Sequence, residues 1–137
     1  MRASHVLVDT SVWSLVLRRS PRRSDEFATE LTTLIEARRA FLIGPIRQEL
    51  LSGVREPSQF TRLQNDLRAF PDLAIRSEDY EEAAAFFNRC RAQGVQGSNI
   101  DFLICAVATR RSMEILTADR DFTSFEQVLP IRLHAIS

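Results

Sequence analysis

The chain has 137 residues, of which 45% are hydrophobic and 26% charged, and its 18 basic residues balance 18 acidic ones. This length and composition are typical of a globular protein that buries its own core without disulfides or a structural metal. No apolar run approaches the ~20 residues that cross a membrane, which excludes a spanning segment. The N-terminus runs straight into a strand-like segment without a signal-peptide pattern. We therefore expect one domain, residues 1–137, in the cytoplasm.

Short apolar segments alternate with helical patterns along the chain. Strands are predicted at 6–8, 40–43, 73–75, 113–117 and 131–133, where apolar or β-branched runs are bounded by turn residues. Helices are predicted at 10–17, 24–39, 45–53, 57–70, 77–94, 99–110 and 119–125, where apolar residues recur on one face. Ser24 is the predicted N-cap of the second helix, and Pro45 and Pro57 suit the first turns of the next two. Strands separated by helices or helix pairs predict a parallel α/β sandwich.

Four acidic residues occupy positions that such a sheet brings together. Asp9 closes the first strand and Asp119 follows the fourth, while Glu49 and Asp101 lie on helices that adjoin strands. The carboxyl ends of parallel strands form the binding crevice of an open sheet. Carboxylates that converge there repel one another unless a cation neutralises them, and oxygen ligands without a His or Cys cluster favour Mg²⁺ or Mn²⁺. These positions, with Asp121 as a fifth candidate, predict a metal-dependent phosphodiesterase.

Each carboxylate also has a purely structural explanation. Asp9 and Asp119 could cap the helices that follow them, and Asp101 lies three residues after Ser98, which is the spacing of a capping box. Glu49 could be a solvated surface residue. Its position on the apolar side of its helix, however, predicts that it faces inward, where an unpaired charge is costly. Each structural explanation is sufficient for one residue, but the convergence of all four at one edge of the sheet favours a site.

All 18 basic residues are arginine, and four of them cluster in one predicted loop. The cluster consists of Arg18, Arg19, Arg22 and Arg23. Arginine binds phosphate with two hydrogen bonds, so this loop is a candidate contact for a phosphate backbone, with a solvated loop as the alternative. The pairs Arg38-Arg39 and Arg110-Arg111 end predicted helices, where the helix dipole alone favours cations. These two pairs therefore need no functional explanation.

Cys90 and Cys105 are the two cysteines, and both lie in predicted helices. We expect two reduced thiols that pack as small apolar groups. A catalytic cysteine would need His5 or His134 beside it. His5 opens the first strand and His134 lies in the tail, so a Cys-His pair is disfavoured.

Four segments of the chain resemble those of PIN-domain ribonucleases of the VapC type, the toxins of type II toxin–antitoxin pairs. The segments occur in family order at 8–13, 48–53, 101–108 and 116–122, and residues 80–94 are similar to the family helix before the third acid. The resemblance implies a PIN-like three-layer α/β/α sandwich with a central, mainly parallel sheet of four to five short strands. It also implies a homodimer and a cognate antitoxin. Phe102 and Cys105 depart from the smaller or aliphatic residues common in the family and should affect packing only.

The resemblance further implies a Mg²⁺- or Mn²⁺-dependent endoribonuclease. The implied catalytic quartet is Asp9, Glu49, Asp101 and Asp119. The implied metal ligands are Asp9, Asp101, Asp119 and Asp121. The small hydroxyl residues that order such a site are Thr10, Ser11 and Thr117. Glu49 either binds the metal or orients the attacking water, and the arginine loop is a candidate RNA-binding rim that counters the repulsion between the site and a polyanion.

Two other functions are considered. One is a PIN-type nuclease of RNA processing without a toxin role, and the other is a non-catalytic module that binds nucleic acid or protein. The small size favours the toxin, and the intact quartet disfavours the binding module. Candidates for the dimer surface are the apolar residues of the predicted helices at 24–39 and 57–70. The identity of the RNA and the choice between one and two ions do not follow from the sequence.

Overall fold

The structure is a computed structural model that describes residues 4–17 and 25–136. Its centre is a parallel four-stranded sheet with the strand order β3-β2-β1-β4. The strands are β1 (Val6–Val8), β2 (Ala40–Ile43), β3 (Asp72–Leu73) and β4 (Glu114–Leu116). Leu7 is in register with Phe41 on one side and with Ile115 on the other. All three residues of β1 are buried, as expected for the central strand of a sheet covered on both faces.

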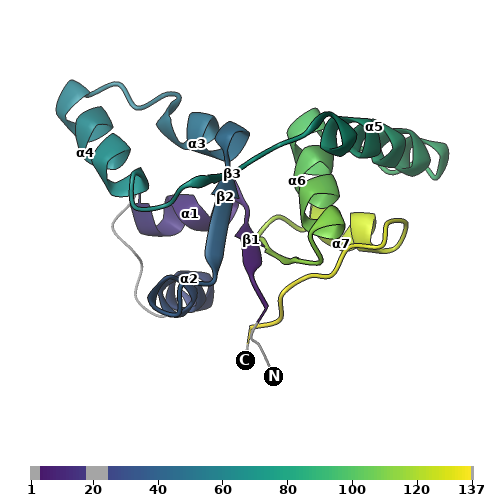
Figure 1. Cartoon of the computed structure of the whole chain (residues 1–137), viewed down its shortest axis with the longest axis horizontal. Helices are drawn as coiled ribbons and strands as arrows, with labels where there is room; N and C mark the ends of the chain where they lie inside the picture. The colour runs from purple at the N-terminus through teal and green to yellow at the C-terminus, as the bar shows by residue number, and fades with distance from the viewer. Residues whose placement is uncertain (1–3, 18–24, 137) are drawn as a thin grey trace.

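Seven helices cover the two faces of the sheet within the described ranges. They are α1 (Thr10–Leu17), α2 (Glu26–Glu36), α3 (Gly44–Leu51), α4 (Pro57–Leu67), α5 (Ser77–Ala92), α6 (Asn99–Arg110) and α7 (Asp121–Glu126). Figure 1 shows α1 to α4 on one side of the strands and α5 to α7 on the other. The prediction of a three-layer α/β/α sandwich around a parallel sheet is therefore confirmed. None of these helices is long and apolar enough to cross a membrane.

The order of the strands determines where a binding crevice forms. The chain adds β2 and then β3 on one side of β1, and it then crosses to the opposite side of β1 to form β4. The direction of winding reverses between β1 and β4. In open α/β sheets, this reversal separates the loops at the carboxyl ends of the two strands and leaves a crevice there. Asp9 and Asp119 follow these two strands.

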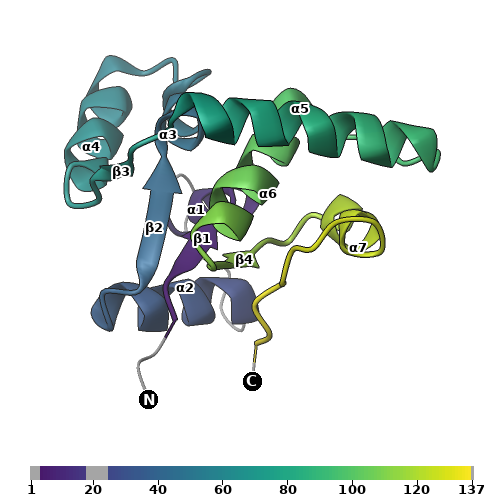
Figure 2. The same ribbon diagram turned by 45° about the vertical axis from the view of Figure 1, so that its right-hand side comes forward.

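Helix α6 is the most deeply buried helix of the second layer. Figure 2 shows it between α5 and the strands. Its residues from Phe102 to Ala108 are all buried, because one side packs on the sheet and the other on α5. Cys105 is among them, and Cys90 of α5 is also buried with a free thiol. Both cysteines are free and buried, as predicted for thiols that pack as apolar groups, and burial raises the pKa of both.

An ion pair not predicted from the sequence joins α5 to the end of α6. The carboxylate of Asp79 is fully buried and accepts hydrogen bonds of 2.9 Å from Arg110 Nε and from both terminal nitrogens of Arg111. The backbone N–H of Arg76 donates to the same carboxylate at 2.8 Å. The interpretation that this arginine pair serves only the helix dipole was therefore incomplete. The pair neutralises a buried carboxylate 31 or 32 residues away.

Several predicted boundaries differ from those observed. Asp25, not Ser24, caps α2, because its carboxylate accepts from the N–H groups of Phe27 and Ala28; Ser24 itself lies outside the described residues. The predicted strand at 131–133 is reduced to one bridge, between Ile115 and Leu133. β3 lies one residue earlier than predicted and is two residues long. Short segments at sheet edges make few ladder hydrogen bonds, so their apolar residues alone do not define their ends.

Candidate active site

Asp9 directly follows β1, at the edge of the sheet where the strand order predicts a binding crevice. Its backbone N–H donates to the carbonyl of Leu116 at 2.9 Å, which fixes the end of β1 against the end of β4. The side chain is only 7% exposed. Its Oδ2 atom accepts hydrogen bonds from Ser11 Oγ at 2.8 Å and Thr117 Oγ1 at 2.9 Å. Burial raises the pKa of Asp9, and these hydroxyl groups offset part of that rise.

The hydroxyls of Ser11 and Thr117 also hold the loop after β4. The N–H of Ala118 donates to Ser11 Oγ and the N–H of Asp119 donates to Thr117 Oγ1, both at 3.0 Å. Each hydroxyl therefore donates to Asp9 and accepts from the neighbouring loop. A hydroxyl can do both at once because it carries one donor and two acceptor sites. The structure thus joins residues from opposite ends of the chain around one carboxylate.

Asp101 enters the crevice from the first turn of α6. Ser98 caps this helix: its hydroxyl accepts from the Asp101 N–H at 3.1 Å, and its own N–H donates to Asp101 Oδ2 at 3.0 Å. Burial raises the pKa of Asp101, and the negative charges of Asp9 and Asp119 raise it further. The three aspartates therefore lie close enough to repel one another. The capping explanation and a site role are compatible, since the cap also fixes the direction of the carboxylate.

Asp119 and Asp121 lie where the chain leaves β4 and enters α7. The carboxylate of Asp119 accepts from the N–H of Asp121 at 2.9 Å, so this side chain is held by the helix that follows. Arg120 is the N-cap residue of α7, which corrects the prediction of a helix starting at residue 119. Asp121 is exposed on the first turn, and its carboxylate makes no hydrogen bond with any residue of the described ranges.

Glu49 lies at the rim of the crevice on α3. Thr10 Oγ1 donates a 2.6 Å hydrogen bond to Glu49 Oε1, which joins the start of α1 to α3. The prediction that Glu49 faces inward was wrong, because its side chain is exposed to solvent. Ile46 and Leu50 of α3 point into the core instead. Glu49 therefore lies on an exposed side of α3, beside Thr10 at the start of α1.

The arrangement offers carboxylate oxygens from three structural elements. Asp9 follows β1, Asp101 starts α6 and Asp119 follows β4, with Glu49 on α3 at the rim. This donor set suits Mg²⁺ or Mn²⁺, which prefer hard oxygen ligands. Within residues 4–17 and 25–136, no three Asp, Glu, His or Cys side chains are already spaced as in a bound ion.

The predicted arginine rim cannot be placed. The candidate RNA-binding residues Arg18, Arg19, Arg22 and Arg23 lie outside the described residues. The sequence disfavours a catalytic thiol, and the structure gives no support for one at Cys105, which is buried. Cys105 lies beneath the site, and burial together with the charge of Asp101 raises its pKa far above the neutral range.

Comparison with known proteins identifies the family. A sequence model of the PIN domain matches residues 6–127, which is most of the chain. The chain belongs to the PIN-domain family. A VapC ribonuclease of Mycobacterium bovis is 31% identical over 121 residues, which is 85% of this chain and 88% of that protein. Ribonuclease VapC11 of Mycobacterium tuberculosis has the same identity and coverage. This PIN domain therefore belongs with the VapC ribonucleases.

Solved structures show the same fold at lower sequence identity. The crystal structure of FitAcB from Neisseria gonorrhoeae matches with a TM-score of 0.76 and 20% identity, and it covers 95% of this chain and 96% of that chain. The structure of VapBC2 from Rickettsia felis, bound to a DNA fragment from their promoter, matches with a TM-score of 0.73 and 15% identity over 94% and 96%. The sheet and helix layers of this PIN domain are thus those of known members.

Proposed function

We propose that the chain is a metal-dependent endoribonuclease that hydrolyses RNA phosphodiester bonds in the crevice between β1 and β4. The observation that carries this proposal is the cluster of Asp9, Asp101 and Asp119, which come from three elements and whose charges oppose one another. A folded protein gains no stability from holding carboxylates together, so their convergence points to a cation as their partner. The similarity to the VapC ribonucleases supports RNA as the substrate.

The acidic residues of the site would bind the metal ion, and nearby hydroxyl groups would hold those residues in position. Asp9, Asp101 and Asp119 hold a Mg²⁺ or Mn²⁺ ion, with Asp121 close enough in sequence to contribute to a second. Such an ion, when bound, lowers the pKa of water and offsets negative charge that develops on the phosphate. Ser11, Thr117 and Ser98 fix the aspartates in advance through their hydrogen bonds.

Glu49 lies where it can act on the nucleophile. Its carboxylate is exposed to solvent next to the residue that follows Asp9, and the hydrogen bond from Thr10 holds one of its oxygens in place. The other oxygen can orient a water for in-line attack on phosphorus or accept its proton. Glu49 already shares one carboxylate oxygen with Thr10, so it has less freedom to enclose an ion than a carboxylate with both oxygens available. We therefore assign Glu49 the water-orienting role.

The same proposal includes a biological role as the toxin of a toxin–antitoxin pair. Structures similar to this chain include VapBC from Salmonella typhimurium bound to DNA and a toxin–antitoxin complex from Klebsiella pneumoniae. By analogy, a cognate antitoxin covers the crevice and blocks access of RNA. The active form is a homodimer in the cytoplasm.

One experiment tests the nuclease activity. Purified chain, freed of any partner, is incubated with total bacterial RNA plus Mg²⁺ or Mn²⁺, beside Asp101→Asn and a control, Asp66→Asn, on the exposed face of α4. New 5′ ends are mapped by sequencing. Discrete metal-dependent cuts by the wild type and the control, lost in Asp101→Asn, are expected. Metal-dependent cutting retained by a folded Asp101→Asn protein would refute the assignment of the site.

A further inference from the structure

A small pocket lies at the C-terminal end of α5, where the chain turns back into α6. Its volume is about 260 Å³, and it is lined by Phe87, Arg91, Val95, Gln96, Gly97 and Phe102. Three of these side chains are apolar, one is a guanidinium and one is an amide. Pockets for drug-sized ligands measure about 300–1,000 Å³, so this pocket suits a smaller group such as a single planar ring system.

The pocket adjoins the proposed active site. Gly97 directly precedes Ser98, whose N–H donates to the carboxylate of Asp101 at 3.0 Å. Phe102 follows Asp101 in α6, so the two side chains leave the helix about 100° apart, one toward the pocket and the other toward the acidic cluster. A nucleotide whose phosphate lies at the acidic cluster therefore has a base within reach of the pocket.

The aromatic wall of the pocket can stack against a base. The rings of Phe87 and Phe102 have centroids 5.5 Å apart and planes at 73°. Phe102 is 1% exposed and also packs on Phe125, with centroids 4.9 Å apart, so its ring is fixed. Phe87 is only partly buried and is the ring that a ligand can meet. Proteins bind unpaired RNA bases by stacking them on aromatic side chains in this way.

The polar groups at the edge of the pocket are available to a ligand. Arg91 and Gln96 are both exposed, and neither side chain forms an ion pair or a hydrogen bond within the described ranges. The backbone N–H groups of Gln96 and Gly97 have no acceptor there either. An arginine side chain only donates hydrogen bonds, whereas a side-chain amide both donates and accepts. The pocket thus combines an apolar interior with an edge made mainly of donors.

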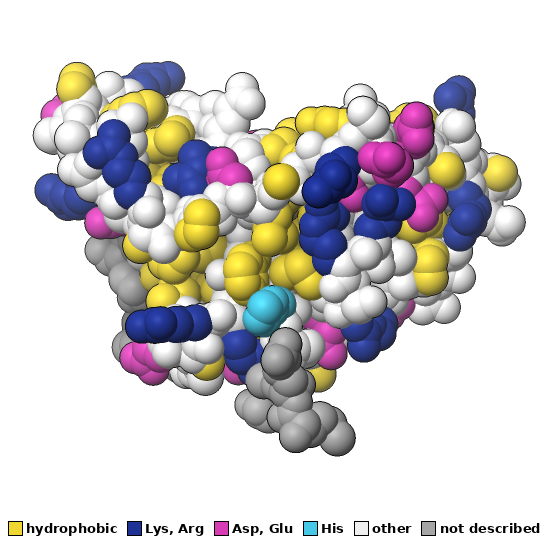
Figure 3. Space-filling model, viewed as in Figure 1, with side chains coloured by type: hydrophobic (Ala, Val, Ile, Leu, Met, Phe, Trp, Pro, Cys, Tyr) yellow, Lys and Arg dark blue, Asp and Glu magenta, His cyan; other side chains and the backbone are white. Residues whose placement is uncertain are grey.

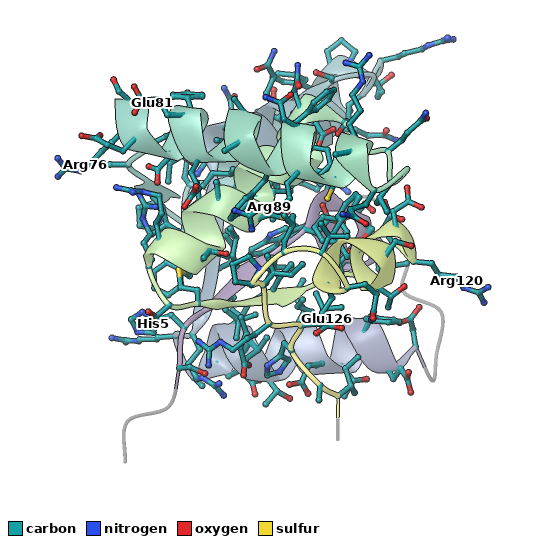
Figure 4. The ribbon with its side chains drawn as sticks, turned by 90° about the vertical axis from the view of Figure 1, so that its right-hand side faces the viewer. His5, Arg76, Glu81, Arg89, Arg120 and Glu126 are labelled. Atoms are coloured by element: carbon teal, nitrogen blue, oxygen red, sulfur yellow. The ribbon has the colours of Figure 1, made fainter. Side chains whose placement is uncertain are left out.

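The charges on α5 favour RNA at this end of the helix. The first half of α5 is acidic, with Glu78 and Glu81, whereas its last turn carries Arg89 and Arg91. Figure 3 shows acidic and basic side chains gathered over this helix, and Figure 4 shows its C-terminal end, far from Glu81, above α7 and on the side of Arg120. The phosphates of RNA are therefore repelled from the start of α5 and attracted to the end where the pocket lies.

We infer that this pocket binds a guanine base of the RNA substrate beside the phosphodiester bond that is cut. Guanine presents two neighbouring acceptors, O6 and N7, to which an arginine such as Arg91 donates two hydrogen bonds. Its N1–H and amino groups are donors, which the amide oxygen of Gln96 can accept. Adenine presents a donor beside N7 and so cannot accept both hydrogen bonds from Arg91. The inference rests on the proposed nuclease function and adds a base preference to it.

Titration with nucleotides tests the pocket without catalysis. Isotope-labelled chain in chelator is titrated with the monophosphates of guanosine, adenosine, cytidine and uridine, and its N–H signals are followed by NMR. The phosphate is common to all four ligands, so a difference between them reports the base. Guanosine monophosphate is expected to shift the signals of Gln96 and Gly97. Its dissociation constant should be at least about fivefold below those of the other three.

Three variants test the assigned contacts, with folding checked by circular dichroism. Arg91→Ala should weaken the binding of guanosine monophosphate by at least about fivefold and reduce the difference between the bases. Phe87→Leu keeps an apolar wall without a ring and should weaken all four ligands together, because stacking tolerates any base. The control Arg89→Ala removes the same charge from the flank of α5 that packs over Phe86, and it should bind like the wild type.

RNA cleavage gives a second measurement of base preference. With total bacterial RNA and Mg²⁺ or Mn²⁺, the wild type is expected to cut beside guanine in unpaired segments. In Arg91→Ala the rate of these cuts should fall by at least about fivefold, and the remaining cuts should spread over the other bases. Arg89→Ala should keep the base profile of the wild type.

Three results overturn the inference. Equal binding of the four monophosphates excludes guanine selectivity, shifts confined to signals outside the pocket place the binding elsewhere, and selectivity that persists in Arg91→Ala excludes the assigned contact. Failure of the pocket and failure of the nuclease remain distinguishable. Metal-dependent cutting without base preference would refute the pocket and leave the nuclease function in place. Selective binding of guanosine monophosphate by a protein that cuts no RNA would support the pocket and refute the nuclease function.

Discussion

Thr117 donates a 2.9 Å hydrogen bond to Asp9 although 108 residues separate them in the chain. The contact exists because β1 and β4 are neighbours in the sheet, with Val8 in register with Leu116. Thr117 also accepts from the N–H of Asp119, so one hydroxyl holds the carboxylate of Asp9 and the backbone that carries Asp119. The geometry of the site therefore depends on the strand order as much as on the acidic residues themselves.

The first prediction concerns this hydroxyl. Thr117→Val keeps the shape and β-branching of the side chain but removes the donor to Asp9 and the acceptor for the Asp119 N–H. We expect a loss of about 1–3 kcal/mol in the free energy of unfolding, since a partly buried N–H loses its partner. Metal affinity should fall about 10–100-fold, because the ligands are no longer held in place. Denaturant unfolding and calorimetric metal titration measure the two effects.

The control for this variant is Thr33→Val on the exposed side of α2, where the hydroxyl bonds only to a carbonyl of its own helix. It should leave metal affinity unchanged. If Thr117→Val binds metal as tightly as the wild type, Thr117 has no positioning role.

The second prediction follows from the buried charge of Asp9. Its pKa is raised in the folded protein, so its contribution to stability is most favourable below the ordinary aspartate pKa and declines as the pH rises through the folded value. At neutral pH without metal, the ionised carboxylate is therefore destabilising. Asp9→Asn, which cannot ionise, should melt a few degrees above the wild type at pH 7 in chelator. The difference should shrink as the pH falls through the raised folded pKa of Asp9 and stay constant below the ordinary aspartate pKa of about 3.9.

Divalent metal should reverse this order. Added Mg²⁺ or Mn²⁺ at a hundredfold excess over Kd should stabilise the wild type by mass action by about 2.7 kcal/mol in the free energy of unfolding, and so raise its melting temperature. Asp9→Asn should be nearly unchanged. Thermal melts with and without metal over pH 3–8 measure both effects. A wild type that is more stable than Asp9→Asn in chelator at pH 7 would show that the ionised Asp9 carboxylate does not destabilise the metal-free protein.

The sequence correctly predicted the helices and strands whose bounds depend only on residues close to them in the chain. The strands at 6–8 and 40–43 and the helices at 10–17 and 99–110 have the predicted bounds, because apolar periodicity and caps determine them. The convergence of Asp9 and Asp119 followed from the rule for parallel sheets. The exposure of Glu49 did not follow, because periodicity identifies the side of a helix that faces the sheet layer but not whether a crevice opens there. The ion-pair partners of Asp79 could not be predicted either, because Arg110 and Arg111 lie 31 and 32 residues further along the chain, at the end of the next helix.

The third prediction concerns this buried carboxylate. Asp79→Ala leaves Arg110 and Arg111 without their partner, and we expect a loss of about 2–3 kcal/mol in the free energy of unfolding. This is below the range for a fully buried pair, since the two arginine side chains are 37% and 25% exposed and can be hydrated. Urea unfolding measures the loss. Asp72→Ala, which breaks a more exposed pair with Arg47, is the matched control and should cost less.

The loss in Asp79→Ala should also depend on pH. The hydrogen bond from Arg111 lowers the pKa of Asp79 to about 2, from an ordinary value near 3.8. A lowered pKa means that the carboxylate stabilises the fold above the ordinary value and loses this effect as the pH falls toward 2. The stability difference between wild type and variant should therefore be constant from about pH 5 to 7 and shrink between pH 4 and 2. A difference that grows on acidification would show that the ion pair is not its source.

The last prediction concerns Gly97, which directly precedes the cap of α6. A Cβ atom at this position would lie 2.5 Å from the ring of Phe125 and 3.1 Å from the ring of Phe102. Both rings are buried, so neither can move aside freely. Gly97→Ala should therefore lower the free energy of unfolding by about 1–3 kcal/mol through overpacking. Because the same loop carries Ser98, displacement of the loop should also shift the carboxylate of Asp101 and reduce RNA cleavage.

Gly44→Ala is the matched control for this substitution. A Cβ atom there comes no closer than 3.8 Å, to the carboxylate of Asp72, which is an ordinary contact. The position lies in the first turn of α3, where alanine is a better helix former than glycine. The control should keep or slightly raise stability, while Gly97→Ala lowers it together with cleavage. Equal stability of the two variants would mean that the ring of Phe125 can move away from residue 97 at no cost in free energy. The packing of Gly97 against Phe125 would then have no role in positioning Asp101.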